Sequence, residues 1–312
     1  MTIWYKILSA IAIMGFANNI QAQQDAQFNL WFMNPTFINP GYSGNTQEGM
    51  FCASGYNRLE LRGFDEAPVS TVINVHGPVN VFGIPSGISV TLQNELAGFL
   101  RAPGLNFGYA YRRALGAGQI GVGISLGIIG SWYANNTWKL PDGGTDPVAP
   151  SQENAGIAFD LGTGAYYSDS RWSGGLSFTH LTSPKLGIDN NARYRPTLYV
   201  MGGFTFFADS TAWTVTPMLM VVSDFTQTSY NIACNAMYNK KYWVGISYRW
   251  GQTITAMAGL EVFSGLNVAY AYEYAISRLS RFSSGTHELM LSYSFAVKAV
   301  RGSQRYKSIR YL

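Results

Sequence analysis

The stretch QIGVGISLGIIGS, residues 119–131, alternates strictly between two kinds of side chain. One set is aliphatic and comprises Ile120, Val122, Ile124, Leu126 and Ile128; the other is small and comprises Gly121, Gly123, Ser125 and Gly127. Successive side chains of a β-strand point to opposite faces, so a period of two predicts a strand. The face that would meet water in an ordinary amphipathic sheet carries glycine and serine instead of charge.

The same period recurs along the chain, for example in LNVAYAYEY at 267–275 and HELMLSYSFAV at 287–297. Fourteen such runs are predicted as strands, at 51–61, 69–78, 86–94, 105–115, 119–130, 156–167, 172–182, 196–207, 212–222, 228–238, 241–250, 254–263, 267–277 and 287–297. An even number of antiparallel strands is what single-chain bacterial outer-membrane barrels have.

Composition narrows the class of protein. Charged residues make up only 12% of the 312 residues, whereas about 25% is usual for globular proteins. Aromatic residues reach 15%, which a disordered chain lacks, and no glycine period indicates collagen. The strand pattern alone leaves a soluble sandwich open. The low content of charged residues, together with the secretory leader described next, favours an all-β, transmembrane outer-membrane β-barrel. Closure of a barrel pairs every backbone N–H and C=O group of its strands, as lipid requires.

Residues 1–22 are predicted to be a signal peptide, with Lys6 ahead of an apolar run of about eleven residues and Ala22 before the cut. That run is shorter than the roughly 20 residues of a spanning helix. No cysteine follows the leader directly, so a lipoprotein is not expected. Cys52 and Cys234 fall in separate predicted strands, and we expect no disulfide between them, although the compartment would permit one.

The links between strands alternate in length. The links at 116–118, 168–171, 208–211, 239–240 and 264–266 are short, whereas several of the others, including 95–104 and 131–154, are long. Short periplasmic turns and long outer loops are typical of such barrels. We therefore expect a barrel at 51–297 with both termini in the periplasm, preceded by a segment at 23–50 and followed by a tail at 298–312.

Neither catalysis nor a cofactor is expected. No G-x-S-x-G, HExxH, CxxC or phosphate-binding loop occurs, and DGGTD at 142–146 lacks the ligand spacing of an EF-hand. His76, His180 and His287 lie on separate predicted strands in ordinary context. Three charged residues fall on inward faces of strands, where they would either pair with one another or line a solvated interior: Asp160, Arg249 and Glu273.

The tail has no acidic residue and five basic ones: Lys298, Arg301, Arg305, Lys307 and Arg310. Such a segment is either a solvated extension or an arm that docks on a periplasmic partner or an anionic polymer. Most of the chain's net charge of +4 comes from this tail, so it does not indicate a nucleic-acid partner.

Residues 23–44 read QQDAQFNLWFMNPTFINPGYSG. Each Asn before Pro is biased toward extended geometry, and each Pro lacks a donor, so we expect an extended capping segment without helix. Its aromatic side chains need a surface, either the protein's own barrel or a partner protein.

This segment resembles the mature N-terminus of the PorP/SprF family of type IX secretion system membrane proteins of Bacteroidetes. The matching residues are Gln24, Asp25, Gln27, Phe28, Asn34, Pro35, Asn39, Pro40, Gly41, Tyr42 and Gly44, with Gly41 standing where Ala is usual. A second match lies in RGFDEAP at 62–68, through Gly63, Phe64, Ala67 and Pro68.

The resemblance implies a non-enzymatic outer-membrane component of type IX secretion, and of gliding motility where the organism glides. Such a component would anchor periplasmic or outer-membrane machinery, or secreted adhesins, to the outer membrane. The candidate partner-binding residues are Gln24, Asp25, Gln27, Phe28, Trp31, Asn34, Pro35, Asn39, Pro40 and Tyr42, with Arg301, Arg305, Lys307 and Arg310 of the tail. The alternative is an outer-membrane diffusion channel or hydrophobic-substrate transporter, which small lumen residues favour slightly and a plugging N-terminal segment disfavours.

Overall fold

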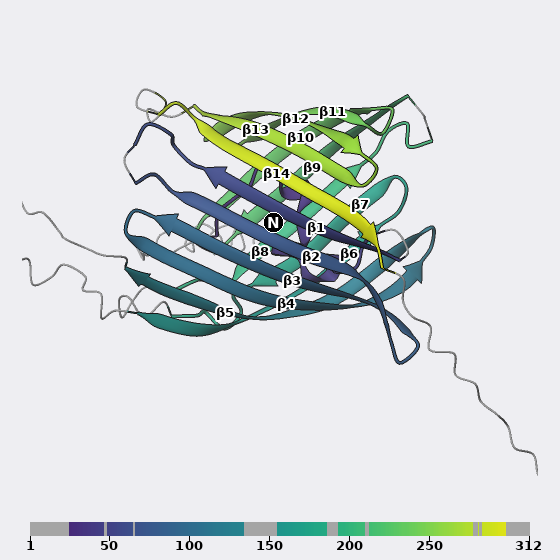
Figure 1. Ribbon diagram of the computed structural model, residues 1–312, viewed down its shortest axis with the longest axis horizontal. Helices are drawn as coiled ribbons and strands as arrows, with labels where there is room; N and C mark the ends of the chain where they lie inside the picture. The colour runs from purple at the N-terminus through teal and green to yellow at the C-terminus, as the bar shows by residue number, and fades with distance from the viewer. Residues whose placement is uncertain are drawn as a thin grey trace, which may run out of the picture.

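The computed structural model describes residues 25–46, 49–64, 66–133, 155–185, 193–209, 212–276, 280 and 283–297. Fourteen antiparallel strands form one closed barrel, in which each strand pairs with its neighbours in sequence and β1 pairs with β14. The strands are strongly tilted across the barrel wall (Figure 1). Closure leaves no sheet edge, as the low charge and the alternating pattern predicted.

The strand bounds follow the predicted ones closely. The strands are β1 Met50–Leu59, β2 Val69–Val81, β3 Ile84–Ala97, β4 Leu100–Leu115, β5 Gly118–Tyr133, β6 Gly156–Ser168, β7 Trp172–Thr179, β8 Thr197–Phe204, β9 Trp213–Ser223, β10 Thr228–Tyr238, β11 Tyr242–Arg249, β12 Thr253–Phe263, β13 Leu266–Ala275 and β14 Thr286–Ala296. Within the described residues, no helix is long and apolar enough to cross a membrane.

One predicted long link is wrong. Residues 95–104 were expected to form an outer loop, but β3 continues to Ala97 and β4 begins at Leu100. Gly98 makes the tight turn possible because it takes a positive φ of 58°. The two strands therefore extend as a hairpin where the sequence shows no clean alternation.

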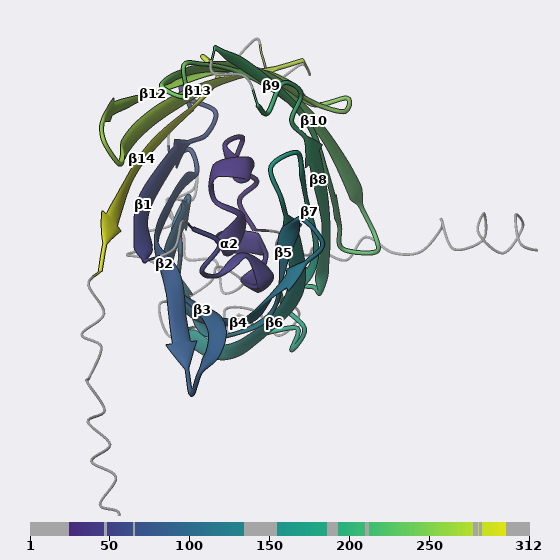
Figure 2. The ribbon, with the colours of Figure 1, turned by 90° about the vertical axis from the view of Figure 1, so that its right-hand side faces the viewer.

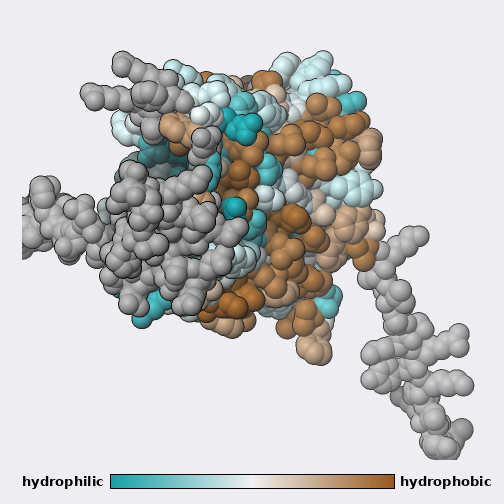
Figure 3. Space-filling view, turned by 60° about the vertical axis from the view of Figure 1, so that its left-hand side comes forward, coloured by the Kyte–Doolittle hydropathy of each residue, from teal (hydrophilic) through white to brown (hydrophobic). Residues whose placement is uncertain are grey.

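The predicted faces of the strands are confirmed. Ile124 is 51% exposed on the outer wall, and Leu289 and Leu291 of β14 are exposed in the same way, whereas Met290 between them is buried. Apolar residues cover much of the outer wall in Figure 3. A continuous apolar outer wall is the surface that lipid requires.

The barrel has two distinguishable ends. We call the end where odd-numbered strands finish the loop mouth, because it carries the links β5–β6 and β7–β8. The opposite end, where β1 begins and β14 finishes, is the turn mouth. Exposed aromatic side chains lie outside the turn mouth along β7 to β11, as expected at a membrane interface: Trp172, Trp213, Tyr238 and Tyr242.

The N-terminal segment lies inside the barrel. Figure 2, viewed into the turn mouth, shows it in the middle of the ring of strands. It folds into three short turns: the 3-10 helix η1 Trp31–Met33, the α-helical turn α2 Pro35–Ile38 and the 3-10 helix η2 Pro40–Tyr42. The predicted extended, helix-free conformation is therefore wrong for this segment, which we call the lumen plug (Asp25 to Thr46).

The error has a local cause. Asn39 is extended, with φ −139° and ψ 105°, as a residue before proline should be. But Pro40 then occupies the first position of a helical turn, where proline needs no donor and its φ is already suitable. The Asn39 side chain caps that turn by accepting a hydrogen bond from the Gly41 backbone N–H at 2.9 Å.

The plug runs the length of the lumen. Asp25 contacts His180, which lies just beyond the end of β7 at the loop mouth. At the turn mouth, the backbone N–H of Val297 donates a hydrogen bond to the carbonyl oxygen of Gly49, beside the start of β1. The first and last described residues therefore lie at opposite mouths, and the periplasmic location of both termini stays a prediction. Residues 1–24 and the basic tail 298–312 lie outside the described residues.

Candidate functional site: the lumen plug

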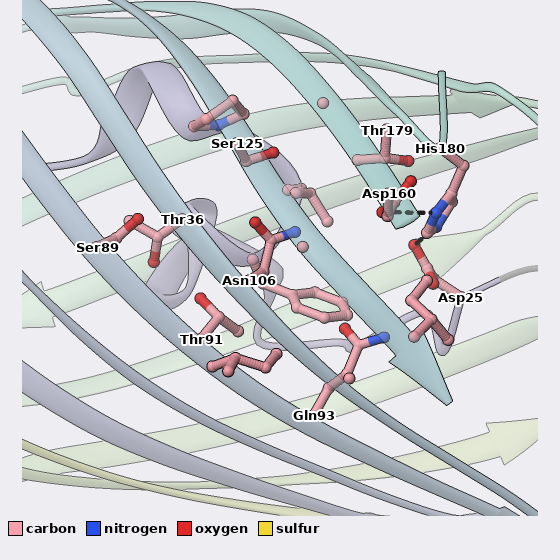
Figure 4. A pocket seen from close by; sticks show the side chains of 18 of the residues that line it. Asp25, Thr36, Ser89, Thr91, Gln93, Asn106, Ser125, Asp160, Thr179 and His180 are labelled. Atoms are coloured by element: carbon pink, nitrogen blue, oxygen red, sulfur yellow. Dashed lines mark hydrogen bonds and ion pairs between the residues drawn. The ribbon is translucent and has the colours of Figure 1, made fainter. Parts of the chain in front are cut away.

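At the loop mouth the plug is held by a buried histidine between two carboxylates. His180 Nε2 lies 2.8 Å from Asp25 Oδ2 of the plug, and His180 Nδ1 lies 3.0 Å from Asp160 Oδ2 of β6. Figure 4 shows the two carboxylates on either side of the ring. Burial lowers the pKa of His180, but the charges of Asp25 and Asp160 outweigh it and raise that pKa to about 10. The imidazolium therefore ties the first described residue of the plug to the wall.

Further in, the backbone of the plug is bound by a carboxylate of the wall. Glu288 of β14 is fully buried and accepts hydrogen bonds from the backbone N–H groups of Asn29, at 2.8 Å, and Leu30, at 3.0 Å. Arg58 of β1 stands 3.4 Å from Glu288, 3.2 Å from Glu273 and 2.8 Å from Glu60. The carboxylate is thus both paired and hydrogen-bonded, which a buried charge requires.

A second arginine holds the neighbouring turn of the plug. Arg249 Nη2 donates to the Gln27 carbonyl oxygen at 3.2 Å and lies 3.6 Å from Glu273. Thr255 donates to the Asn29 side-chain oxygen at 3.1 Å. The inward charges Arg249 and Glu273 therefore pair with each other, one of the two outcomes expected for them, and they also bind the plug.

Apolar packing fills the middle of the lumen. Phe28 and Leu30 of the plug are buried against Tyr56, Trp243 and other wall residues. Trp31 and Ile38 are buried on the other side in a second cluster, whose wall residues are Tyr199, Met201, Met220, Val222 and Ala233. Aromatic pairs such as Phe28–Phe37, with ring centroids 5.6 Å apart, meet edge to face. The core of this protein is thus the interface between plug and barrel.

Near the turn mouth the contacts again reach the plug backbone. Ser177 donates to the Ile38 carbonyl at 2.6 Å, and Asn39 donates to the Ala165 carbonyl at 3.0 Å. Ser43 and Ser89 hydroxyls are 2.8 Å apart, and Arg112 donates to the Ser43 carbonyl at 3.2 Å. Hydrogen bonds from β3, β4, β6 and β7 therefore hold the last part of the plug before β1.

The small residues on the inner wall have a specific reason. A Cβ atom on Gly87 or Gly121 would collide with the carbonyl oxygen of Ser43 or Gly41, respectively. A Cβ on Gly123 would meet the Pro40 carbonyl oxygen at 2.5 Å. The glycine face of 119–131 thus allows the plug backbone to approach the wall, and it does not mark an open channel. The cavity drawn in Figure 4, which Ser125 and Gly127 of the same face help to line, has a volume of only about 30 Å³.

Most sequence-predicted site residues come together in this plug. All of those that are described face the protein's own wall: Asp25, Gln27, Phe28, Trp31, Asn34, Pro35, Asn39, Pro40 and Tyr42. Gln24 and the tail residues Arg301, Arg305, Lys307 and Arg310 lie outside the described residues. Of the two surfaces considered for these aromatics, the barrel's own lumen is the one they occupy.

Sequence reasoning missed four charged residues that hold the plug: Arg58, Arg112, His180 and Glu288. Arg58, Arg112 and Glu288 sit on the inward face of predicted strands, so the rule that selected Arg249 would also have found them. The sequence predicts His180 to be an ordinary strand residue, but β7 ends at Thr179 and His180 has a positive φ of 55°. No pattern signalled its pairing with Asp25, 155 positions away.

The described residues offer no group of three His, Cys, Asp or Glu side chains placed to hold a metal ion. Cys52 and Cys234 are both free thiols in this structure. The wall holds the plug through hydrogen bonds to its backbone and through apolar contacts, an arrangement that seats a peptide segment.

Solved structures of other proteins share this architecture. The TodX deltaS2S3 mutant, a monoaromatic hydrocarbon channel, matches with a TM-score of 0.54 at 9% identity, over 92% of this chain and 98% of that one. The toluene transporter TbuX of Ralstonia pickettii matches with a TM-score of 0.51 at 11% identity, over 92% and 99%. At such identities the likeness concerns the outer-membrane barrel fold alone.

A search of curated proteins found no match. The model of the family described as type IX secretion system membrane protein PorP/SprF matches residues 20–293, which include the plug and all but the last few barrel residues. With the Asn-Pro plug seated in a closed barrel of fourteen strands, this chain belongs to the PorP/SprF family of type IX secretion system membrane proteins.

Proposed function

We propose that this protein serves type IX secretion as a closed outer-membrane scaffold, without enzymatic activity. It anchors periplasmic and outer-membrane components of the machinery, or secreted adhesins, to the outer membrane. The observation that carries the proposal is the plug, which occupies the lumen and is hydrogen-bonded to the wall from the loop mouth to the turn mouth. In a barrel filled in this way, the plug occupies the lumen. The two mouths then remain as surfaces for binding other proteins.

The proposed orientation follows from the links. Long links favour the loop mouth as the cell-surface end, because outer loops exceed periplasmic turns in such barrels. Asp25 then faces the surface, and the tail after Val297 begins in the periplasm, where its basic residues dock on machinery components. An epitope inserted at 142–146 should be labelled on intact cells, and one placed after Val297 should be labelled only after permeabilisation. The reverse labelling would overturn the orientation.

The alternative function is a diffusion channel or a hydrophobic-substrate transporter, which the likeness to hydrocarbon channels supports at the level of fold only. Single-channel recording separates the two functions. The wild-type protein in a planar bilayer should give no steady conductance, whereas a variant with residues 25–46 replaced by a short Gly-Ser linker should conduct. Steady wild-type conductance of porin size would favour the channel.

The scaffold role itself needs a cellular assay. Deleting the gene should reduce secreted cargo, and the wild-type protein should co-purify with components of the secretion machinery from native outer membranes. Undiminished secretion in the deletion strain would contradict the proposed function.

A further inference from the structure

The two mouths of the lumen differ in the chemistry of their inner surface. At the loop mouth, the recess beside Asp25 is lined by charged side chains, which water solvates: Arg58, Glu60, Glu95, Arg249 and Glu273. At the turn mouth, an apolar groove lies between η1 of the plug and strands β6 to β11, and none of the described residues that line it is charged. We call it the turn-mouth groove and define it by five of these residues: Phe32, Met33, Met218, Met237 and Trp243.

The described chain covers the turn-mouth groove only in part. Met237 is 37% exposed, and Phe32, Met33 and Met218 are half-buried. Met237 lies on the inner face of the wall, because Trp243, its partner on β11, is buried in the apolar core of the lumen. The barrel is closed, so lipid does not reach this face. Apolar surface that water can reach is stabilised when another apolar group covers it.

The tail, residues 298–312, begins at the same mouth as the groove. It continues from Val297, whose backbone N–H donates to the Gly49 carbonyl oxygen there. Its second half, RYKSIRYL at 305–312, interleaves basic residues with four apolar ones: Tyr306, Ile309, Tyr311 and Leu312. A charged side chain buried in an uncharged groove would lack a counter-charge. The apolar side chains of the tail are therefore the ones that suit the groove.

The tail is long enough to cross the mouth. Figure 2 shows β14 on the opposite side of the ring from β7 to β10, which carry much of the groove. Fourteen strands that are about 4.8 Å apart and tilted by about 40° give a barrel about 28 Å across. The stretch 298–306 spans up to about 30 Å when extended. Tethering gives the tail an effective concentration of about 1 mM, so even a modest affinity keeps it bound.

We propose that residues 305–312 bind in the turn-mouth groove of their own chain. Their apolar side chains pack against η1 and the wall, where methionine sulfur makes favourable contacts with tyrosine rings. The basic side chains between them stay at the rim of the mouth, where water solvates them. This binding is independent of the proposed scaffold function, since it needs no partner and is tested on purified protein.

Thiol labelling tests the proposal in the full-length protein. In a chain whose Cys52 and Cys234 are replaced by serine, Met237→Cys places a single thiol in the groove. With an effective concentration of about 1 mM and a Kd of about 0.1 mM, the groove is free about a tenth of the time. Labelling by a charged maleimide should therefore become about tenfold faster when the four apolar tail residues are all replaced by serine. Unchanged labelling would overturn the proposal.

The control thiol is Phe82→Cys, made in the same background. Phe82 is 100% exposed at the β2–β3 turn of the same mouth and does not line the groove. Its labelling should be equally fast with either tail. Rapid labelling of Met237→Cys in the purified protein with an intact tail, and protection only in native membranes, would assign the groove to a partner protein and overturn the proposal. Heat-modifiable gel mobility checks that each variant is folded.

Cross-linking identifies the tail as the occupant. On oxidation, Ile309→Cys with Met237→Cys should form a disulfide within one chain faster than Ile309→Cys with Phe82→Cys. A free tail would favour the second pair, because Phe82 is more exposed than Met237 and β2 is closer to β14 around the barrel than β10 is. Equal or faster cross-linking of the Phe82 pair would overturn the proposal.

A last variant separates apolar binding from attraction by charge. Replacing Arg301, Arg305, Lys307 and Arg310 together with Gln keeps the apolar residues of the tail and removes most of its charge. This change should leave the labelling rate of Met237→Cys within about twofold, because exposed charges at the rim contribute little to binding. Labelling as fast as with the four serine replacements would show that charge holds the tail, and would overturn binding through the apolar side chains.

Discussion

Glu288 offers a quantitative test of how the plug is held. Its buried carboxylate accepts the backbone N–H groups of Asn29 and Leu30 at 2.8 and 3.0 Å, one on each oxygen. Glu288→Gln keeps the shape but replaces one oxygen with an NH₂ group, so one plug N–H loses its acceptor. A hydrogen bond to a charged group contributes about 1.5–3 kcal/mol, and a buried donor left alone costs about 1–3 kcal/mol. Arg58 keeps Glu273 and Glu60 as partners.

We therefore expect Glu288→Gln to reduce the free energy that seats the plug by about 2–4 kcal/mol, which corresponds to roughly 30-fold to 1,000-fold more opening. Hydrogen exchange followed by mass spectrometry measures this directly, because local opening sets the exchange rate of protected amides. Peptides from 25–46 should exchange faster by that factor, while peptides from the strands opposite, β5 to β9, should not change.

Glu66→Gln is the control, since it removes the same charge from an exposed turn at the loop mouth. Unchanged exchange of the plug in Glu288→Gln would refute the reasoning that this carboxylate holds the plug. Equal acceleration of plug and strands would mean that Glu288 stabilises the whole barrel and not the seat of the plug.

Three further predictions follow from the structure. Ile124→Arg places a charge on the lipid face and should cost about 2–4 kcal/mol, seen as a lower midpoint in heat-modifiable gel mobility, whereas Ile124→Phe should be nearly neutral. The pKa of His180 is raised to about 10, so its contribution to stability should be complete below pH 6.5 and lost as the pH rises toward 10. The difference in thermal midpoint between wild type and His180→Gln should therefore shrink across that window, and a difference that grows with pH would contradict the ion pair. Replacing Arg301, Arg305, Lys307 and Arg310 together with Glu should weaken the salt-sensitive co-purification of periplasmic machinery, while the amount of barrel in the outer membrane stays unchanged. Normal co-purification would mean that the tail is only a solvated extension.

The barrel was predictable from the sequence because its signal is local. Alternation in 119–131, 267–275 and 287–297 fixes which side chains face lipid, and a low content of charge excludes most soluble folds. The hairpin between β3 and β4 was not predictable, since 95–104 combines glycine, proline and charge without a period.

The plug's position was not predictable from local pattern, because its partners are distant in sequence. Leu30 and Glu288 are 258 positions apart, and Asp25 and His180 are 155 apart. The resemblance drew attention to the right residues of the plug, but only the structure shows that the small residues of 119–131 receive its backbone. The helical turns had a signal in the two Asn-Pro steps, since proline suits the first position of a turn as well as an extended chain.

The central claim is that a barrel with its plug in place performs the function. The Ser43 and Ser89 hydroxyls, 2.8 Å apart, allow a direct test, because cysteines at these two positions would bond plug to wall. Ser43→Cys and Ser89→Cys would be combined in a protein whose Cys52 and Cys234 are replaced by serine, and produced in the native cell, where the compartment permits disulfides. The measurement is secretion of cargo, with the cross-linked fraction determined by mass spectrometry and each single-cysteine variant as control. A cross-linked protein that secretes as much cargo as the single-cysteine variants is the predicted result; secretion lost only in the cross-linked protein would mean that the plug must leave its seat.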